Sequence, residues 1–212
     1  MKQTITDLKL DKHNCGRIRV FLGHRFAFTV DLLDAAHLEK GCEISDDTIY
    51  QLRYKHDRFE AYNRSIKYIK YRLRSRKEVE QYLTGKRFSS EIIADTITRL
   101  TDENLLNDTI FAQSWINSRN KFKPRATTAL RFELLQKGID KGIIDTVLAD
   151  VDDEMLARTI VERKLGQWCK LNRRDAKVKI FNYLRRRGFN YEISMSAYRY
   201  ALSLQTTLKP ES

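Results

Sequence analysis

The residues best suited to chemistry in this chain are lysines and arginines that gather in clusters. One cluster consists of Lys121, Lys123 and Arg125, and it follows Phe111 and Trp115, which are spaced one helical turn apart. Cationic side chains at this density can neutralise phosphates and release the counterions of a polyanion. The two aromatic residues are expected to pack in a core. The cluster therefore predicts contact with nucleic acid, and a merely solvated basic face is the alternative.

Basic charge recurs along the chain. The net charge is +12, and residues 51–88, 119–139 and 163–188 carry 12, 6 and 10 basic residues against 4, 1 and 1 acidic ones. The segments between them, 89–118 and 140–162, are acidic. Registered clusters of this kind are typical of a surface that binds a nucleic-acid backbone without strong sequence specificity. The candidate binding residues are Arg72, Arg74, Arg76, Lys77, Lys121, Lys123, Arg125, Arg131, Arg173, Arg174, Lys177, Lys179, Arg185, Arg186 and Arg187.

Residues that could support catalysis or hold a metal lack the required spacing. The run Asp150–Glu154 gathers carboxylates that a nuclease could use, but it lacks the glycine and the final glutamate of a calcium loop, and helix starts favour acidic residues in any case. No glycine-rich phosphate-binding motif occurs. The histidines and cysteines near the N-terminus lack zinc-site spacing; they are His13, Cys15, His24, His37 and Cys42. We therefore expect no catalytic residue, no metal and no cofactor.

Cysteine usage and hydropathy indicate the compartment. Cys15, Cys42 and Cys169 are widely spaced and odd in number, which fits a reducing cytosol better than a disulfide framework. The N-terminus lacks an apolar signal segment, and no apolar run approaches the length of a membrane span. We expect a cytoplasmic protein, monomeric and without membrane association.

The strand pattern is confined to the first fifty residues. Arg17–Leu22 alternates apolar and polar side chains, and Arg25–Val30 is rich in aromatic and β-branched residues. The two residues between these segments predict a β-hairpin, to which Ile5–Leu10 can add a third strand. Ser45 and Asp46 are typical of a helix start, and the rest of the chain has helical spacing.

The helical part repeats. Three stretches that begin at Val79, Leu130 and Ile180 align without gaps, at offsets of 51 and 50 residues. Each predicts one helix, a tight turn, and a second helix with an apolar face. Because a helix pair cannot bury its face alone, we expect each pair to recruit a third helix, at 108–120 after the first pair and at 153–169 after the second.

The domains predicted in this way are a β-hairpin and helix module at 1–50, then repeats at 51–120, 121–170 and 171–212. In this division Phe111 and Trp115 belong to the core of the first repeat. The turns of the second and third repeats contain Gly138 and Gly188, where the chain must pass through a left-handed residue. Arg87 stands at this position in the first repeat, so we expect its turn to be built differently.

Four segments resemble the RecX family of recombinase regulators, and the resemblance covers residues 61–205. They are "YIKYRLRSRKEVEQYL", "LLNDTIFAQSWINSR", "KPRATTALRFELLQKGI" and "RRRGF". The resemblance implies a mainly α fold of three tandem three-helix repeats in an elongated bent array, here after a small N-terminal β-hairpin module. It also implies a protein without catalysis that binds in the groove of the RecA nucleoprotein filament and limits filament growth or promotes disassembly. RecA ATP hydrolysis, strand exchange and co-protease activity would then fall, as part of recombination, DNA repair and the SOS response.

On this resemblance the basic clusters would contact DNA, single- or double-stranded, or the filament. Acidic residues would face the recombinase; the candidates are Asp102, Glu103, Asp152 and Asp153. Three other functions stay open from the residues alone. These are a general nucleic-acid-binding helical repeat without a recombinase partner, a metal-dependent nuclease, and a pure protein-interaction scaffold.

Overall fold

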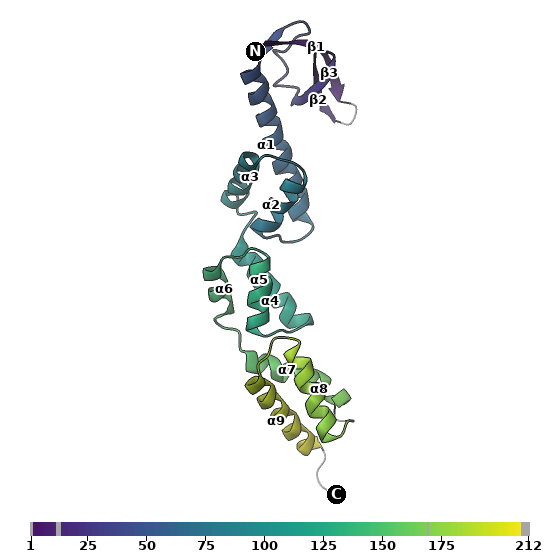
Figure 1. Cartoon of the computed structure of the whole chain (residues 1–212), viewed down its shortest axis with the longest axis vertical. Helices are drawn as coiled ribbons and strands as arrows, with labels where there is room; N and C mark the ends of the chain where they lie inside the picture. The colour runs from purple at the N-terminus through teal and green to yellow at the C-terminus, as the bar shows by residue number, and fades with distance from the viewer. Residues whose placement is uncertain (1, 12–13, 169, 209–212) are drawn as a thin grey trace. The chain divides into compact units, whose positions relative to one another are not determined.

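The computed structural model describes residues 2–11, 14–168 and 170–208 (Figure 1). The chain divides into two compact units. Unit 1 comprises Met1–Leu73 and Val79–Leu106, and unit 2 comprises Arg74–Glu78 and Asn107–Ser212. The strands β1 to β4 lie in unit 1, and the other regular elements of the described residues are helices, as expected for a mainly α protein with an N-terminal strand module.

The N-terminal module is a four-stranded antiparallel sheet. Its strands are β1 (Lys2–Asp11), β2 (Asn14–Leu22), β3 (Arg25–Asp31) and β4 (Glu43–Ser45), in the order β3-β2-β1-β4. The predicted hairpin and third strand are confirmed, whereas β4 was not expected. Gly23 and His24 join β2 to β3 and both have positive φ, of 54° and 65°, which is the requirement of the tight hairpin turn that matches strand twist.

Helix α1 (Asp46–Lys70) connects the sheet to the first helical group. It begins where the sequence predicted, because the Ser45 hydroxyl accepts a hydrogen bond from the Thr48 backbone N–H. It packs against β3 and β4 of the sheet and against α2 (Arg76–Gly85) and α3 (Ser90–Asp102). Arg17 of β2 links the sheet to this helix, since its guanidinium forms ion pairs with Asp31 of β3 and with Glu60 of α1.

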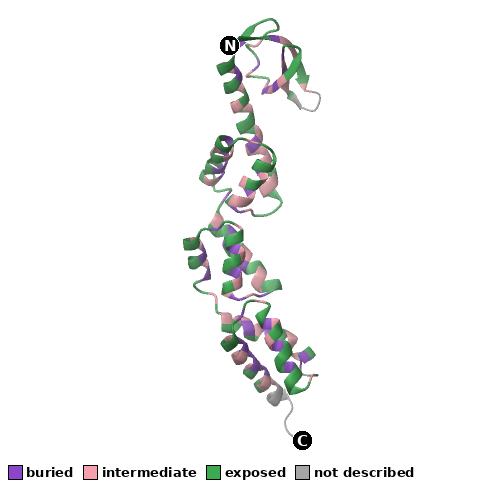
Figure 2. Ribbon diagram, in the orientation of Figure 1, coloured by how far each residue is buried: buried purple, intermediate pink, exposed green. Residues whose placement is uncertain are grey.

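Two further groups of three helices make up most of unit 2. The first consists of α4 (Asp108–Phe122), α5 (Thr127–Gln136) and α6 (Lys141–Leu148), and the second of α7 (Asp153–Trp168), α8 (Arg173–Arg185) and α9 (Tyr191–Leu208). Each group encloses its own buried core, which Figure 2 shows in purple. Three three-helix repeats, with α1 to α3 as the first, are therefore confirmed.

The predicted partners of α4 and α7 are wrong. The sequence placed α4 behind the first helix pair, but buried Phe111 and Ile116 pack with Leu130 and Leu134 of α5. Likewise the buried face of α7 belongs to the core that it forms with α8 and α9, and α7 is not the third helix of the α5 and α6 pair. Both helices therefore precede the pair that they cover, because each repeat is built in the order first helix, second helix, turn and third helix.

The three turns have the same geometry, so the expectation of a different first turn is also wrong. Arg87 has φ of +66°, close to the +79° of Gly138 and the +89° of Gly188. In each turn the next residue donates its N–H to the carbonyl of a buried leucine five residues earlier, as Phe88 does to Leu83 at 3.3 Å. Arg87 is exposed, and its side chain is accommodated at the cost of left-handed backbone strain.

The glycines of the second and third turns are required by close neighbours. A Cβ on Gly138 would lie 2.5 Å from Cδ of Lys77, and one on Gly188 would lie 2.8 Å from Cβ of Ala129. In both cases the neighbour is the first turn of a helix packed on the glycine, α2 or α5. The side-chain hydrogen of glycine is what permits this approach.

Two joints of the same construction hold these helix starts in unit 2. At the first joint the Arg76 backbone N–H donates to Asp108 at 2.8 Å, and the Ser75 hydroxyl donates to the Lys137 carbonyl at 2.7 Å. At the second joint the Thr127 N–H donates to Asp153 at 2.8 Å, and the Thr128 hydroxyl to the Gly188 carbonyl at 2.9 Å. Each joint thus satisfies a helix N-terminus with a carboxylate at the start of the next repeat.

Candidate nucleic-acid interface

The basic cluster after α4 divides into exposed and engaged residues. Lys121 and Lys123 are exposed at the end of the helix. Arg125 instead pairs with Glu133 of α5 at 2.9 Å, and Glu133 also accepts from Arg119 at 2.8 Å and from the indole N–H of Trp115 at 2.7 Å. A single half-buried carboxylate therefore fixes three donors, and Arg125 has a structural role that leaves Lys121 and Lys123 as the exposed cations of this cluster.

Helix α8 carries the densest set of cations. Five of its predicted residues and the residue that caps its end are exposed, and they are Arg173, Arg174, Lys177, Lys179, Arg185 and Arg186. Over the described residues, none of the ion pairs found includes any of these six side chains. Val178, which is 54% exposed, lies among them. Lys177 lies 5.8 Å from the centroid of the Phe181 ring, and Arg186 donates to the Asn182 carbonyl at 3.2 Å. The other four cations make no side-chain contact that is found among the described residues, so they remain available to a ligand.

Arg187, just after α8, is different from these six. It is half-buried, its guanidinium lies 3.7 Å from the centroid of the Tyr183 ring, and its carbonyl accepts from the Ala126 N–H at the second joint. Lys164 of α7 approaches the same ring at 5.3 Å. Cations placed over aromatic faces gain electrostatic stabilisation, so Arg187 contributes to the fold of the third repeat.

The first cluster is also mixed. Arg76 is exposed, whereas Lys77 is half-buried, with its stem over Gly138 and its ammonium group 3.3 Å from the Gln136 carbonyl. Arg72 is exposed and donates to the Leu73 carbonyl, and Arg74 is half-buried. In the second repeat Arg131 pairs with Asp145. Sequence spacing identified these cations, but only the fold separates those held by carboxylates and carbonyls from those facing solvent.

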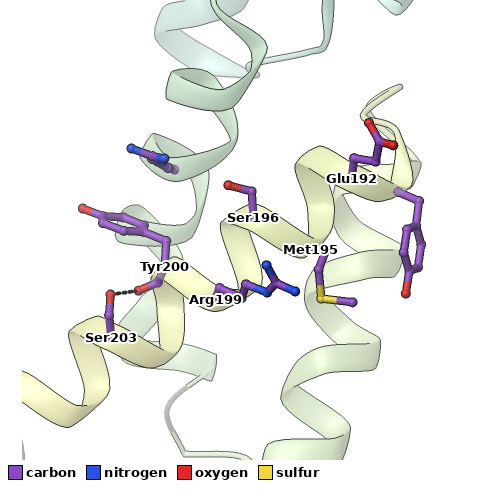
Figure 3. Close-up of a pocket in the computed structure, with 8 residues that line it drawn as sticks. Glu192, Met195, Ser196, Arg199, Tyr200 and Ser203 are labelled. Atoms are coloured by element: carbon purple, nitrogen blue, oxygen red, sulfur yellow. Dashed lines mark hydrogen bonds between the residues drawn. The ribbon is translucent and has the colours of Figure 1, made fainter.

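A groove between α7 and α9 adds residues that the sequence analysis missed. Its volume is about 590 Å³, and Figure 3 shows Arg199, Ser196 and Tyr200 projecting from α9 around it. The Arg158 guanidinium lies 5.5 Å from the centroid of the Tyr200 ring. The hydrogen bond that Tyr200 donates to Glu162 raises the pKa of this tyrosine. Arginines beside tyrosine rings suit phosphates and unstacked bases. The sequence analysis relied on clusters of cations, and Arg158 and Arg199 were missed because they lie far apart in the sequence.

Arg163 is a further missed residue in the third repeat. It lies within the basic segment 163–188 but was not singled out, and its guanidinium donates to the Lys121 carbonyl at 3.2 Å. This contact places a cation of α7 beside the exposed end of α4. Lys121, Lys123 and Arg163 therefore belong to one neighbourhood of unit 2, which periodicity alone could not reveal.

The four acidic candidates differ in how far the fold uses them. Asp102 is exposed at the end of α3, and Glu103 accepts from Tyr62 and Arg99, which lower its pKa. Asp152 caps α7 by accepting from two backbone N–H groups, and Asp153 holds the second joint. Substitution of Asp152 or Asp153 would therefore disturb the fold as well as any contact with a partner.

The described part of the chain contains no group of three or more histidine, cysteine or carboxylate side chains placed to share a metal ion. Of the residues considered for zinc, His24, His37 and Cys42 are exposed and Cys42 is a free thiol, while His13 lies outside the described residues and the Cys15 side chain is not described. Among the helices with described residues, none combines the length and apolar character needed to span a bilayer.

Comparison with known proteins gives three family matches that follow the helix groups of the structure. Residues 61–100, 107–148 and 152–197 match the first, second and third three-helix domains of RecX. The second match begins at α4 and the third just before α7, in agreement with the core contacts.

Individual relatives and solved structures agree with these matches. The regulatory protein RecX of Bacillus subtilis (strain 168) is 33% identical over 198 residues, which cover 91% of this chain and 75% of that protein. The RecX protein of Finegoldia magna is 35% identical over 157 residues, covering 71% and 77%. A crystal structure of RecX from Lactobacillus salivarius superposes with a TM-score of 0.62 at 26% identity, over 70% of this chain and 99% of that one. A second regulatory protein RecX structure has a TM-score of 0.64 at 21% identity and covers 90% and 96%.

Proposed function

The chain belongs to the RecX family of regulatory proteins, and from that premise we propose that it regulates the RecA recombinase. It binds the RecA filament on DNA and lowers RecA ATP hydrolysis, strand exchange and co-protease activity by limiting filament growth or promoting disassembly. This role assigns it no catalytic residue and no cofactor. It acts in the cytoplasm as a monomer, in homologous recombination, DNA repair and the SOS response.

The observation that carries the proposal is the set of exposed cations on α8 that enter none of the ion pairs found among the described residues, namely Arg173, Arg174, Lys179 and Arg185. A cation that is already paired with a carboxylate attracts a phosphate only weakly, whereas an exposed cation outside any ion pair can replace the counterions of a phosphate. Lys121 and Lys123 add the same property at the end of α4 in the same unit. Binding through such groups depends on backbone phosphates, which fits an interaction with DNA of any sequence.

Binding to a filament adds a second source of affinity. A recombinase-coated strand offers protein surface next to phosphates, and simultaneous contact with both raises the effective concentration of each. A regulator of this kind acts when it is scarce relative to the recombinase, since one bound molecule affects many subunits. A general nucleic-acid-binding repeat, the alternative, competes for DNA only when added in bulk.

The experiment measures RecA ATPase activity on single-stranded DNA with the protein present below the recombinase concentration. The wild-type chain is expected to inhibit. The triple variant Arg174→Ala, Lys179→Ala and Arg185→Ala removes three exposed cations whose side chains have no partner found among the described residues, and it is expected to lose most of this inhibition. On bare single-stranded DNA it is expected to reduce the slope of log affinity against log salt by about 2.

A matched control removes the same charge elsewhere. Arg25, Lys40 and Lys141 are exposed and lie outside the three clusters, so their triple alanine variant is expected to inhibit like the wild type. Equal loss in both triple variants would show that net charge alone matters. Inhibition that appears only when the protein saturates the DNA would favour the general nucleic-acid binder.

A further inference from the structure

A cavity between α4, α6 and α7 has a chemistry opposite to that of the basic helices. It lies within unit 2 and has a volume of about 360 Å³. The side chains around it carry amides, hydroxyls, carboxylates and apolar groups, and neither lysine nor arginine is among the described residues that line it. The chain has 40 basic residues among 212, so a cavity whose described lining lacks them is a site that a cation can enter without electrostatic repulsion from its walls.

Hydrogen-bond acceptors in the cavity are only partly used. Asp150 is exposed in the link between α6 and α7, and no ion pair found among the described residues includes it. Asp152 uses Oδ1 to accept from the backbone N–H groups of Glu154 and Met155. Asn120 Oδ1 is buried and finds no donor in the described part of the chain. Buried acceptors normally have a donor, so this oxygen would gain one if the partly buried Asn120 side chain turned toward a donor in the cavity.

The remaining walls fit an aliphatic stem. Ile116 and Leu156 form apolar surface on α4 and α7, and Met155, which is 67% exposed, stands at the rim with an adaptable side chain. Lysine and arginine combine an aliphatic stem with a head group that has donors and no acceptor. Acceptors without donors, apolar walls and no competing cation match both parts of such a side chain.

We propose that this cavity receives a lysine or arginine side chain from a protein partner. The identity of that partner rests on the proposed function, in which it is the recombinase of the filament. A DNA backbone is not the occupant, because phosphates would face Asp150 and Asp152. In this proposal the carboxylates of the link between α6 and α7 bind the protein partner, whereas the exposed cations of the chain bind DNA.

The first test uses a small probe and does not depend on the recombinase. N-acetyl-arginine methylamide is added at millimolar concentration to the isotope-labelled full chain, and the side-chain amide signals of Asn117 and Asn120 are followed by NMR. These signals are expected to shift in a saturable way in the wild type and to shift much less in Asp150→Asn, which keeps the shape of the side chain. Absence of local shifts, identical shifts in the variant, or equal shifts with Mg²⁺ in place of the probe would overturn the proposal.

The second test uses the filament. Asp150→Lys is expected to weaken binding to recombinase-coated single-stranded DNA about tenfold while binding to bare DNA stays the same or becomes tighter. Glu39→Lys, an exposed residue of unit 1, makes the same change in net charge and is expected to leave filament binding unchanged. Equal filament binding by Asp150→Lys and the wild type overturns the assignment to the recombinase.

The two tests separate the possible failures. If the wild type does not bind the coated filament while the arginine probe still shifts the two asparagines, the proposed function fails and the cavity stands. If filament binding is intact in Asp150→Lys and the probe has no effect, the cavity proposal fails and the regulatory function stands.

Discussion

Gly188→Ala tests whether the joint between the second and third repeats requires a glycine. The new Cβ would lie 2.8 Å from the Ala129 Cβ, 3.2 Å from the Thr128 hydroxyl and 3.4 Å from the Ala129 backbone nitrogen. The nearest of these atoms is the Cβ of Ala129, which is bonded directly to the α5 backbone and therefore cannot move aside by a side-chain rotation. The same residue has φ of +89°, a backbone conformation that side-chain-bearing residues rarely adopt.

Two costs add in this variant. A left-handed conformation costs an alanine about 1–2 kcal/mol, and a methyl group forced into a packed contact costs about 1–3 kcal/mol. The expected loss in the free energy of unfolding is therefore about 2–5 kcal/mol, which combines the same two contributions. Movement of α5 away from the turn would relieve the clash only by breaking the hydrogen bond from Thr128 to the Gly188 carbonyl.

The assay is urea unfolding of the full chain followed by tryptophan fluorescence, because both tryptophans, Trp115 and Trp168, lie in unit 2. Gly166→Ala is the matched control. Gly166 lies within α7, and apart from the backbone of its own helix a Cβ there has no neighbour within 4 Å in the described part of the chain. This variant is expected to gain about 0.5–1 kcal/mol from the helix propensity of alanine. Equal stability of Gly188→Ala and the wild type would refute the close-contact explanation.

Three further predictions concern single contacts. Glu133→Gln leaves the Trp115 indole and two guanidinium groups without their carboxylate, so the unfolding free energy of unit 2 is expected to fall by about 1–3 kcal/mol, measured by tryptophan fluorescence in urea. Arg87→Gly relieves left-handed strain at an exposed turn and is expected to raise the thermal unfolding midpoint; a lower midpoint would show that the arginine side chain stabilises the turn. The hydrogen bond that Tyr54 donates to Asp95 raises the pKa of this phenol to about 12 from its ordinary 10. Because the folded chain holds this proton more tightly than the unfolded chain, the contact stabilises below pH 10 and the stabilisation is lost as pH rises toward 12. Ultraviolet absorbance at high pH, compared between the wild type and Tyr54→Phe, is expected to show one phenol titrating late, and a difference spectrum that titrates with the other tyrosines would contradict it.

The sequence predicted the helices better than their partners. Three aligned stretches located α2, α5 and α8 and the helices after them, because apolar spacing and turn glycines are local properties. The position of α4 could not be obtained in this way. An apolar face says that Phe111 must be buried, but not whether the covering helices come before or after it in the chain. The links on either side of α4 are both short, so chain length did not decide the question.

The candidate site shows the same limit. A run of cations predicts a basic surface, yet Arg125 is held by Glu133 from the next helix and Arg187 lies over Tyr183. Such pairing depends on the orientation of one helix relative to its neighbour, and a count of charges along the sequence gives no information about that orientation. Arg158 and Arg199 were missed for the converse reason, since they are 41 positions apart in the sequence and line one groove only in the folded third repeat.

The middle repeat carries both halves of the joint. Asp108 and Gly138 contact the first turn of α2. Thr127 and Thr128, in the first turn of α5, contact Asp153 and Gly188 in the corresponding way. A tandem duplication of residues 107–151 would therefore create a new boundary at which the Thr127 N–H meets Asp108, as it meets Asp153 in this chain. Proteins of this architecture can lengthen by whole modules without new surface having to evolve, and a four-module version of this chain is an immediate object for engineering.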